Sequence, residues 1–261
     1  MRYKTVIGVL TYSKMDFLRE CVASFIENTT DISDPQKTVF IIANNSEDDN
    51  YIRRVEVLAN QWGDGKAITT LNFRRNRGTS AAWNAIARVY DCEQVVIAND
   101  DIVVHPYWRE VMDYGFKTTP DMGVFGFQDK HGKENWGFQN THDLTEKLDF
   151  QEVIYPSGSF LMFEKRKFEE VGGFDEELFI GLEESLFAID LMKKGYTNYQ
   201  VGDAKREYWF ANHYGGATGY SEATDSVEYF QKKLQTRWPL TAEYEIELKA
   251  IRDRKKIERG L

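Results

Sequence analysis

Four short apolar segments, each followed by a polar break and a stretch with helical spacing, constrain the fold of this chain more than any other feature. The segments are residues 6–10, 39–43, 67–71 and the run that begins at Val95. Strands buried on both faces read as continuous apolar runs, and their alternation with helices is typical of a parallel sheet with right-handed crossovers. The sequence therefore predicts an α/β fold whose sheet is flanked by helices.

The fourth apolar run ends abruptly in Asn99, Asp100 and Asp101 before it becomes apolar again. In open α/β sheets, ligands sit beyond the carboxyl ends of the strands. Two carboxylates at such an edge repel each other. A divalent cation bound between them would offset this repulsion, and a bound diphosphate would complete its coordination shell. Asn and Asp are also favoured in plain strand-end turns. The residues alone leave a metal site and a turn both open.

Length, composition and charge exclude several classes of protein. The 261 residues fit one large domain or one domain with an extension, and 42% hydrophobic residues supply a sizeable core. A net charge of -9 argues against a nucleic-acid docking face. The cysteines, Cys21 and Cys92, form no CxxC pair and are expected to be free thiols in a reducing compartment. With no signal peptide and no apolar stretch of roughly 18 residues, we expect no integral membrane segment and a cytoplasmic location.

The middle of the chain is less regular. A helix is expected after Pro106, followed by a strand near residues 122–127. Residues 128–149 show no clear period, which predicts an irregular insertion or lid. An apolar strand is then expected within residues 154–163.

Two further helices and a C-terminal segment complete the predicted organisation. A short helix is expected to stop at Gly172-Gly173, and a longer one to run from Glu183 to about Lys194. Residues 221–261 are predicted to form a helical extension with a basic end, for which a solvated helix is the simplest account.

Several short motifs recur in this chain in a characteristic order. They are Val9-Leu10-Thr11-Tyr12, Asn76-Arg77-Gly78 with Ala81, Ala82 and Asn84, Asn99-Asp100-Asp101, Gly172-Gly173-Phe174-Asp175-Glu176, Glu183-Glu184 and His213-Tyr214-Gly215-Gly216. Together they resemble the inverting glycosyltransferases of family 2 type over about residues 4–219. The resemblance implies a GT-A (Rossmann-like) fold with a mixed, mainly parallel sheet. Residues 1–220 would form the catalytic domain and 221–261 the C-terminal helical extension.

The resemblance also implies how a sugar nucleotide would be held. The loops after the first two strands would bind the nucleoside, which makes donor-binding candidates of Thr11, Tyr12, Asn44, Ser46 and Asp48. At the end of the second strand, where the family usually has an acidic residue, this chain has Ala43 followed by Asn44 and Asn45. An amide side chain can donate hydrogen bonds as well as accept them, whereas a carboxylate only accepts. An Asn/Asp-rich turn without a ligand is the structural alternative.

The loop that opens the third helix is where the family approaches the donor. Arg74 or Arg77 would pair with a phosphate oxygen, and Gly78 permits close backbone approach at a helix start. Asn76 and Asn84 belong to the same motif and are expected to bind the donor. A solvated basic loop and a simple turn glycine are the structural alternatives.

The Asn99-Asp100-Asp101 turn resembles the DxD motif of the family. Asp101 would be the direct metal ligand, and Asn99 would contact the ribose or a metal-bound water. Asp100 is counted with Asn99 among the donor-binding candidates, a side chain that points elsewhere being the alternative for Asp100. His213 resembles the histidine that completes the metal site, although an isolated histidine is more often structural. Because an imidazole nitrogen suits Mn²⁺ better than Mg²⁺, we expect Mn²⁺ or Mg²⁺ with Mn²⁺ favoured.

Glu183-Glu184 matches the acidic pair of the family, of which the second residue is the general base. Glu184 would take the proton from the acceptor hydroxyl, and Glu183 would be structural or bind the acceptor. Carboxylates are also favoured in the first turn of any helix, which is the structural alternative.

These features predict a metal-dependent inverting glycosyltransferase that uses a nucleotide-diphosphate sugar, a UDP-sugar being favoured, and transfers the sugar to an acceptor hydroxyl. A nucleotidyltransferase or a dehydrogenase would need a Gly-rich phosphate loop after a strand, which the sequence lacks. A catalytically silent member that binds carbohydrate or sugar nucleotide is the alternative from another class. The acceptor stays open among saccharide, lipid-linked, protein and modified nucleic-acid hydroxyls.

Overall fold

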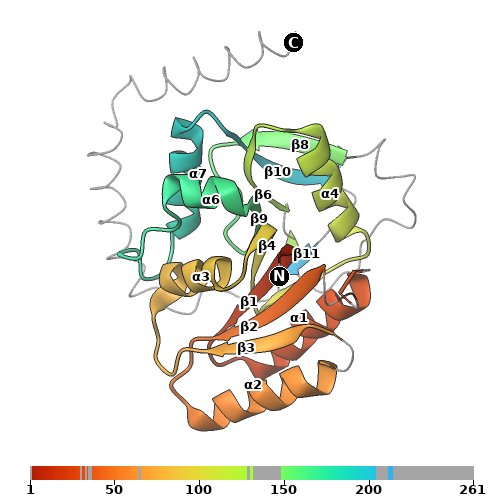
Figure 1. Ribbon diagram of the computed structural model, residues 1–261, viewed down its shortest axis with the longest axis vertical. Helices are drawn as coiled ribbons and strands as arrows, with labels where there is room; N and C mark the ends of the chain where they lie inside the picture. Colours follow the sequence, from red (N-terminus) through yellow and green to blue (C-terminus); the bar gives the residue numbers. More distant parts are fainter. Residues whose placement is uncertain are drawn as a thin grey trace.

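A mixed β-sheet runs through the computed structural model, which describes residues 2–29, 31–32, 34, 37–63, 66–127, 130–131, 148–203 and 211–213 (Figure 1). Within these residues the main sheet has eight strands in the order β3-β2-β1-β4-β9-β6-β10-β8. Its strands are β1 (Tyr3–Thr11), β2 (Thr38–Asn44), β3 (Ile68–Asn72), β4 (Cys92–Asn99), β6 (Met122–Phe127), β8 (Leu148–Val153), β9 (Phe160–Glu164) and β10 (Thr197–Asp203). A small second sheet pairs β5 (Ile102–Val104), β11 (Ala211–His213) and β7 (Lys130–His131) in that order.

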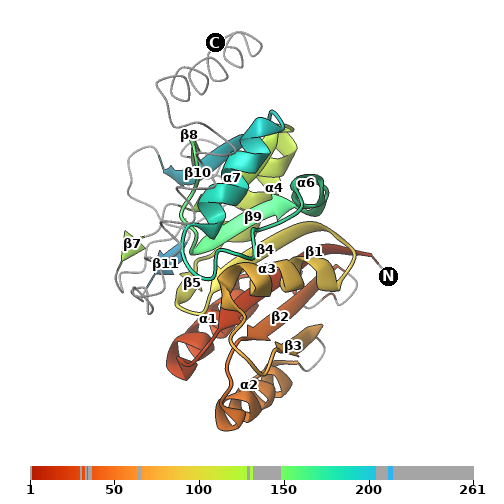
Figure 2. The same ribbon diagram turned by 90° about the vertical axis from the view of Figure 1, so that its left-hand side faces the viewer.

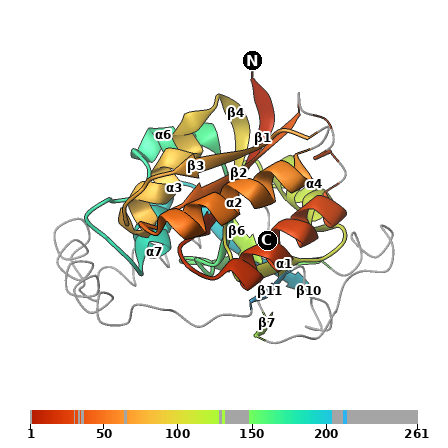
Figure 3. The ribbon, with the colours of Figure 1, turned by 90° about the horizontal axis from the view of Figure 1, so that it is seen from below.

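Helices cover both faces of the main sheet, as the view from below shows (Figure 3). One face carries α1, α2 and α4, and the other carries α3, α6 and α7. Their bounds are α1 Met15–Asn28, α2 Asp49–Trp62, α3 Gly78–Val89, α4 Trp108–Thr118, α6 Lys165–Val171 and α7 Glu183–Lys193. None of the helices in the described residues is long and apolar enough to cross a membrane.

Each face of the sheet has its own hydrophobic core. Under α1 and α4, the ring of Phe25 packs edge-on against Trp108, with 5.3 Å between the ring centroids. Under α6 and α7, Phe174 and Phe187 approach to 4.4 Å between centroids. Because both faces are covered, the central strands are buried along most of their length, which is why they read as continuous apolar runs.

The first four predicted strands are all present and confirm the expected α/β architecture. β1 pairs in parallel with β2 and β4, and β2 pairs in parallel with β3. Beyond β4 the sheet becomes mixed, because β9 lies antiparallel between β4 and β6. The prediction of a mixed, mainly parallel sheet flanked by helices is therefore confirmed.

Some sequence predictions lie wholly or largely outside the described residues. In the expected insertion at 128–149, the structure describes β7 and the start of β8. The predicted helical extension at 221–261 lies outside the described residues. The predicted end of the short helix is confirmed, since Gly172 caps α6 with φ 88°. The longer helix, α7, ends at Lys193, close to the predicted Lys194, and Gly195 with φ 88° follows it.

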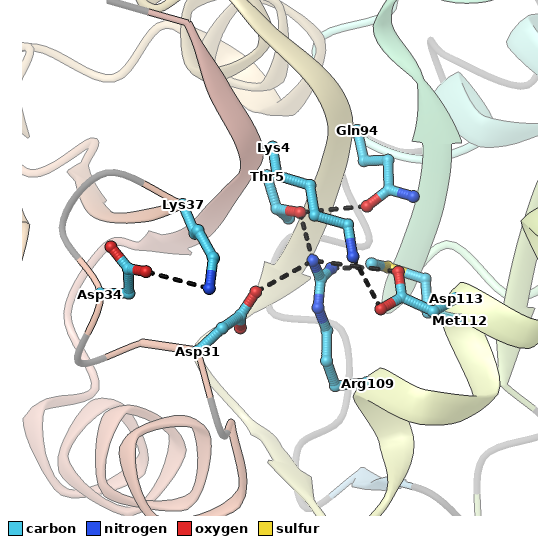
Figure 4. Close-up of polar contacts among 9 residues, drawn as sticks. All are labelled: Lys4, Thr5, Asp31, Asp34, Lys37, Gln94, Arg109, Met112 and Asp113. Atoms are coloured by element: carbon cyan, nitrogen blue, oxygen red, sulfur yellow. Dashed lines mark hydrogen bonds and ion pairs between the residues drawn. The ribbon is translucent and has the colours of Figure 1, made fainter.

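A buried arginine ties together the amino ends of the central strands (Figure 4). Arg109 of α4 is 2% exposed, and its Nη2 donates to the hydroxyl of Thr5 at 2.5 Å and lies 3.3 Å from the carboxylate of Asp31. The Thr5 hydroxyl in turn donates to Oε1 of Gln94 on β4 at 3.1 Å. These contacts join α4 to β1 and β4 near the amino ends of the two strands.

The carboxyl ends of the parallel strands meet at the opposite edge. The register pairs Thr11 of β1 with Asn44 of β2, Asn44 with Asn72 of β3, and Leu10 with Asn99 of β4. Polar residues from four strands therefore stand in one row. The small sheet of β5, β7 and β11 lies on the side of the molecule away from the N-terminus (Figure 2). Any ligand site of the sheet is expected at this carboxyl edge.

Candidate active site

The turn after β4 carries two adjacent carboxylates, Asp100 and Asp101, at the carboxyl edge. The Thr11 hydroxyl donates to Oδ2 of Asp100 at 2.6 Å and also contacts the hydroxyl of Tyr51. Burial and then the negative charge of Asp101 raise the pKa of Asp100 to about 7, against the lowering effect of the Thr11 bond. Burial raises the pKa of Tyr51 to about 12, so this hydroxyl stays protonated near neutral pH. A cation at this turn would relieve the repulsion between the two carboxylates.

β11 brings the predicted histidine to the same turn. Its antiparallel pairing with β5 places the backbone of His213 opposite Ile102, the residue directly after Asp101. The side chain of His213 lies outside what the structure describes. Among the residues with described side chains, no three histidine, cysteine or carboxylate groups lie close enough together to hold a metal ion. A complete ligand set would therefore need His213 or oxygen atoms of a bound donor.

The predicted nucleoside loop after β2 makes hydrogen bonds within itself and with the end of β3. Asn44 is fully buried; its Nδ2 donates to Oδ1 of Asn72 at 3.2 Å and its Oδ1 accepts from the backbone N–H of Ser46 at 3.0 Å. The hydroxyl of Ser46 accepts from the N–H of Asp48, whose own carboxylate caps α2. These contacts shape the loop. By contrast, Tyr12, directly after β1, is 49% exposed.

Asn45 is a site residue that the sequence reasoning missed. Its Nδ2 donates to Oδ1 of Asn76 at 2.9 Å and to the carbonyl of Gly78 at 3.2 Å, and its Oδ1 accepts from the N–H of Arg77 at 2.9 Å. Asn76 also accepts from the N–H of Gly78 at 3.0 Å. Asn45 thus fixes the β3–α3 loop against the β2–α2 loop. In the sequence, the only indication of this role is that Asn45 follows another asparagine, Asn44, at the end of β2.

The β3–α3 loop also reaches the segment before α7. Gly78 has φ 76°, and a Cβ there would lie 2.5 Å from the carbonyl oxygen of Phe179, so this position needs glycine in both conformation and space. The next N–H, that of Thr79, donates to the same carbonyl at 2.7 Å. The two predicted phosphate-binding arginines differ: Arg74 pairs with Asp49 at 3.3 Å, while Arg77 lies over the ring of Phe73.

Asn84 lies in the middle of α3, and its amide is committed to the protein. Its Nδ2 donates to the carbonyl of Phe174 at 2.8 Å and to Oε1 of Glu176 at 2.9 Å, and its Oδ1 accepts from the N–H of Phe174 at 2.9 Å. Close packing adds to this, since a Cβ on Gly173 would lie 2.6 Å from the Asn84 oxygen. Asn84 therefore holds the loop that follows α6.

Glu183 and Glu184 open α7 directly after two residues with positive φ, Gly181 and Leu182. Burial and then the charge of Glu184 raise the pKa of Glu183, whose Oε2 has no hydrogen-bond partner among the described residues. Burial likewise raises the pKa of Glu184, which lies against Gly158 and accepts from the Ser185 hydroxyl at 3.4 Å. A buried carboxyl and a half-buried one, adjacent in sequence and both with a raised pKa, are suited to proton transfer near neutral pH.

A continuous series of contacts joins these groups. The N–H of Asn99 donates to the carbonyl of Ser159 at 3.0 Å, which fixes the metal-candidate turn to the loop that faces Glu184. The Asn45 bonds and the Gly78–Phe179 contact link the loops after β2 and β3 to the segment before α7. The structure thus places the predicted acidic turn, the predicted acidic pair and the polar loops along one edge of the sheet.

Comparison with known proteins agrees with this arrangement. A family model described as glycosyl transferase family 2 matches residues 6–172, well over half of the chain. A comparison with curated protein sequences gives no significant match.

Solved structures with a similar fold are also glycosyltransferases. The mannosyltransferase PcManGT from Pyrobaculum calidifontis, in complex with GDP-Man and Mn²⁺, is 18% identical with a TM-score of 0.59, over 77% of this chain and 55% of that chain. S. aureus TarS is 13% identical with a TM-score of 0.61, over 89% and 40%. GalNAc-T7 with UDP, GalNAc and Mn²⁺ is 12% identical with a TM-score of 0.63, over 83% and 44%.

At these identities the likeness concerns the fold, and this chain spans about half the length of the solved chains. The GT-A fold and the glycosyltransferase class predicted from the sequence motifs are confirmed. With the family model covering most of the sheet and the acidic turn, the chain belongs to glycosyl transferase family 2.

Proposed function

We propose that this protein transfers a sugar from a nucleotide-diphosphate sugar to an acceptor hydroxyl, with inversion at the anomeric carbon and with the help of a divalent metal ion. The observation that carries the proposal is the acidic turn at residues 99–101, fixed through the Asn99–Ser159 hydrogen bond to the loop that faces Glu184. A leaving diphosphate and an attacking hydroxyl need opposite ends of one site. In this proposal the acidic turn serves the leaving diphosphate, and Glu184 serves the attacking hydroxyl.

The donor would lie along the carboxyl edge, with its diphosphate at Asp101. Asp101 and His213 would hold the metal ion, since the backbone of His213 pairs with Ile102, the residue directly after Asp101. A carboxylate and an imidazole are ligands that fit Mn²⁺ or Mg²⁺. When bound, it would supply Lewis-acid stabilisation of the departing nucleoside diphosphate. Solved neighbours contain GDP-Man or UDP, which supports a nucleotide sugar, and we favour a UDP-sugar.

The chemical step falls to Glu184 in this proposal. Its carboxylate takes the proton of the acceptor hydroxyl as the oxygen forms a bond to the anomeric carbon. The bond from that carbon to the diphosphate oxygen breaks on the opposite face, so a single displacement inverts the centre. The raised pKa of the Glu183–Glu184 pair favours proton uptake near neutral pH.

The contacts of the other candidates divide them into two groups. Tyr12, Arg77 and the backbone of Gly78 are proposed to meet the donor. Asn44, Ser46, Asp48, Asn76 and Asn84 make protein hydrogen bonds that shape the loops, so we propose that they position the donor site. Arg74 lies beside Asp49 on the surface and could reach the donor by leaving that exposed pair.

The test is hydrolysis of a panel of UDP-, GDP- and dTDP-sugars with Mn²⁺, Mg²⁺ or chelator. We expect slow metal-dependent release of one nucleotide, lost in Asp101→Ala, and donor binding without turnover in Glu184→Gln. Asp91→Ala, an exposed carboxylate before the other end of β4, is the matched control and should behave as wild type. Donor binding without turnover by wild type with any acceptor would favour a silent binding protein instead. The acceptor and the cytoplasmic location stay predictions.

A further inference from the structure

Gly158 occupies the position closest to the carboxyl group of Glu184. A Cβ placed on Gly158 would lie 2.8 Å from Cδ of Glu184, 3.0 Å from its Cγ and 3.0 Å from its Oε2. The φ of Gly158 does not lie in the left-handed region, so an L residue is conformationally acceptable there. Glycine at 158 therefore supplies space, and that space is taken by the Glu184 carboxyl.

The loop that carries Gly158 cannot easily withdraw. On one side, the N–H of Asn99 donates to the carbonyl of Ser159 at 3.0 Å. On the other side, Gly126 of β6 presses so closely that a Cβ there would lie 2.8 Å from the Phe160 carbonyl and 3.0 Å from Cβ of Pro156. The backbone around Gly158 is thus held from both sides, and Glu184 is the partner that must yield.

Glu184 can yield, because its carboxyl group is the far end of a flexible side chain. An added methyl at 158 would have to move that group from 2.8 Å to an ordinary contact distance of 3.4–4 Å. The displacement is roughly 1 Å, and misplacement of a reacting group by that amount can lower a rate about 100-fold. The rest of the fold would be little affected, since no backbone has to move.

We propose that Gly158 is a positioning residue, whose missing side chain sets where the Glu184 carboxylate meets the acceptor hydroxyl. This inference rests on the proposed function, in which Glu184 is the general base. The space left by the glycine accommodates the carboxyl end of the Glu184 side chain.

The experiment measures kcat, donor KM and thermal midpoint for wild type, Gly158→Ala and Gly115→Ala. Gly115 on α4 is a matched control, because a Cβ there would be equally crowded, 2.9 Å from the ring of Phe150, but away from the acidic edge. We expect Gly158→Ala to lower kcat about 10- to 100-fold while donor KM stays within about twofold and the midpoint hardly changes. Gly115→Ala should instead lower the midpoint and leave kcat unchanged.

A double-mutant cycle then combines Gly158→Ala with Glu184→Ala and compares the effect of Gly158→Ala with and without the Glu184 carboxyl group. With no carboxyl to displace, the added methyl should leave the residual rate of that variant unchanged. Unchanged kcat in Gly158→Ala, an equal loss in both backgrounds, or a loss matched by falling midpoint and donor binding would each overturn the inference. An active wild type with an active Glu184→Gln would remove the base assignment and the inference with it. An inactive wild type would refute the proposed function itself.

Discussion

Replacement of Asn84 by alanine separates a donor-binding role from a role inside the protein. The Asn84 amide makes two buried hydrogen bonds to the backbone of Phe174 and a third to Glu176. An unsatisfied buried polar group costs about 1–3 kcal/mol, so losing the partner of both Phe174 groups should lower the free energy of unfolding by about 2–4 kcal/mol after some relaxation. In a chain of this size that corresponds to a fall of roughly 5–15 °C in the thermal midpoint.

The assay is urea and thermal unfolding of Asn84→Ala, run beside donor KM. Asn60→Ala is the matched control, since Asn60 is exposed on α2 and its loss should change stability by less than about 0.5 kcal/mol. The result that would refute this reasoning is an unchanged midpoint together with a raised donor KM. Asn84 would then contact the donor, as its motif suggested.

Three further predictions concern other parts of the molecule. Asn45→Ala should raise donor KM at least several-fold in steady-state kinetics, because three hydrogen bonds that fix the β3–α3 loop are lost; an unchanged KM would contradict this. Glu183 has its pKa raised from 4.5 to about 8 in the folded protein, so the folded state binds the proton more tightly and stability should fall as pH rises from about 5 to 8. Glu183→Gln should flatten that dependence in urea unfolding at pH 5.5 and 8.5, and an unaltered slope would speak against it. Arg109→Met should lower the free energy of unfolding by roughly 2–3 kcal/mol in the same assay. This loss is smaller than for a fully buried ion pair, because Asp31 is partly exposed. A changed donor KM would contradict the position of Arg109 at the amino ends of the strands, away from the donor site.

The strands that the sequence predicts well are those buried on both faces. β1, β2 and β4 are apolar along most of their length because helices cover the sheet on each side. β10 was missed, since Thr197–Asp203 contains few apolar residues. Its Asn198 is fully buried and donates to the carbonyls of Ile154 and Ala188, a contact between distant segments that no local pattern reveals.

Strand direction and the small sheet were also beyond the sequence pattern. The apolar run of Phe160–Glu164 indicates a buried strand but carries no information on direction, and β9 is antiparallel to both of its neighbours. β5 and β11 have three residues each, too short for periodicity to predict them.

The candidate site divides in the same way. The acidic turn and the acidic pair could be predicted because several charged or amide residues at a strand end or helix start form a local motif. The sequence could not predict which residue of the Asn44-Asn45 pair contacts the β3–α3 loop, because that depends on where each amide points in the folded protein. Gly158 gave no signal at all, since its role depends on a carboxyl group twenty-six residues away in sequence (184 − 158).

Binding of Mn²⁺ and UDP to the acidic turn tests the account most directly. Calorimetric titration of UDP would be run with Mn²⁺ or chelator on wild type, Asp101→Ala and the control Asp91→Ala. We predict Mn²⁺-dependent UDP binding by wild type and Asp91→Ala, and its loss in folded Asp101→Ala. Equal Mn²⁺-dependent binding by Asp101→Ala would contradict the assignment of the metal–diphosphate site to this edge of the sheet.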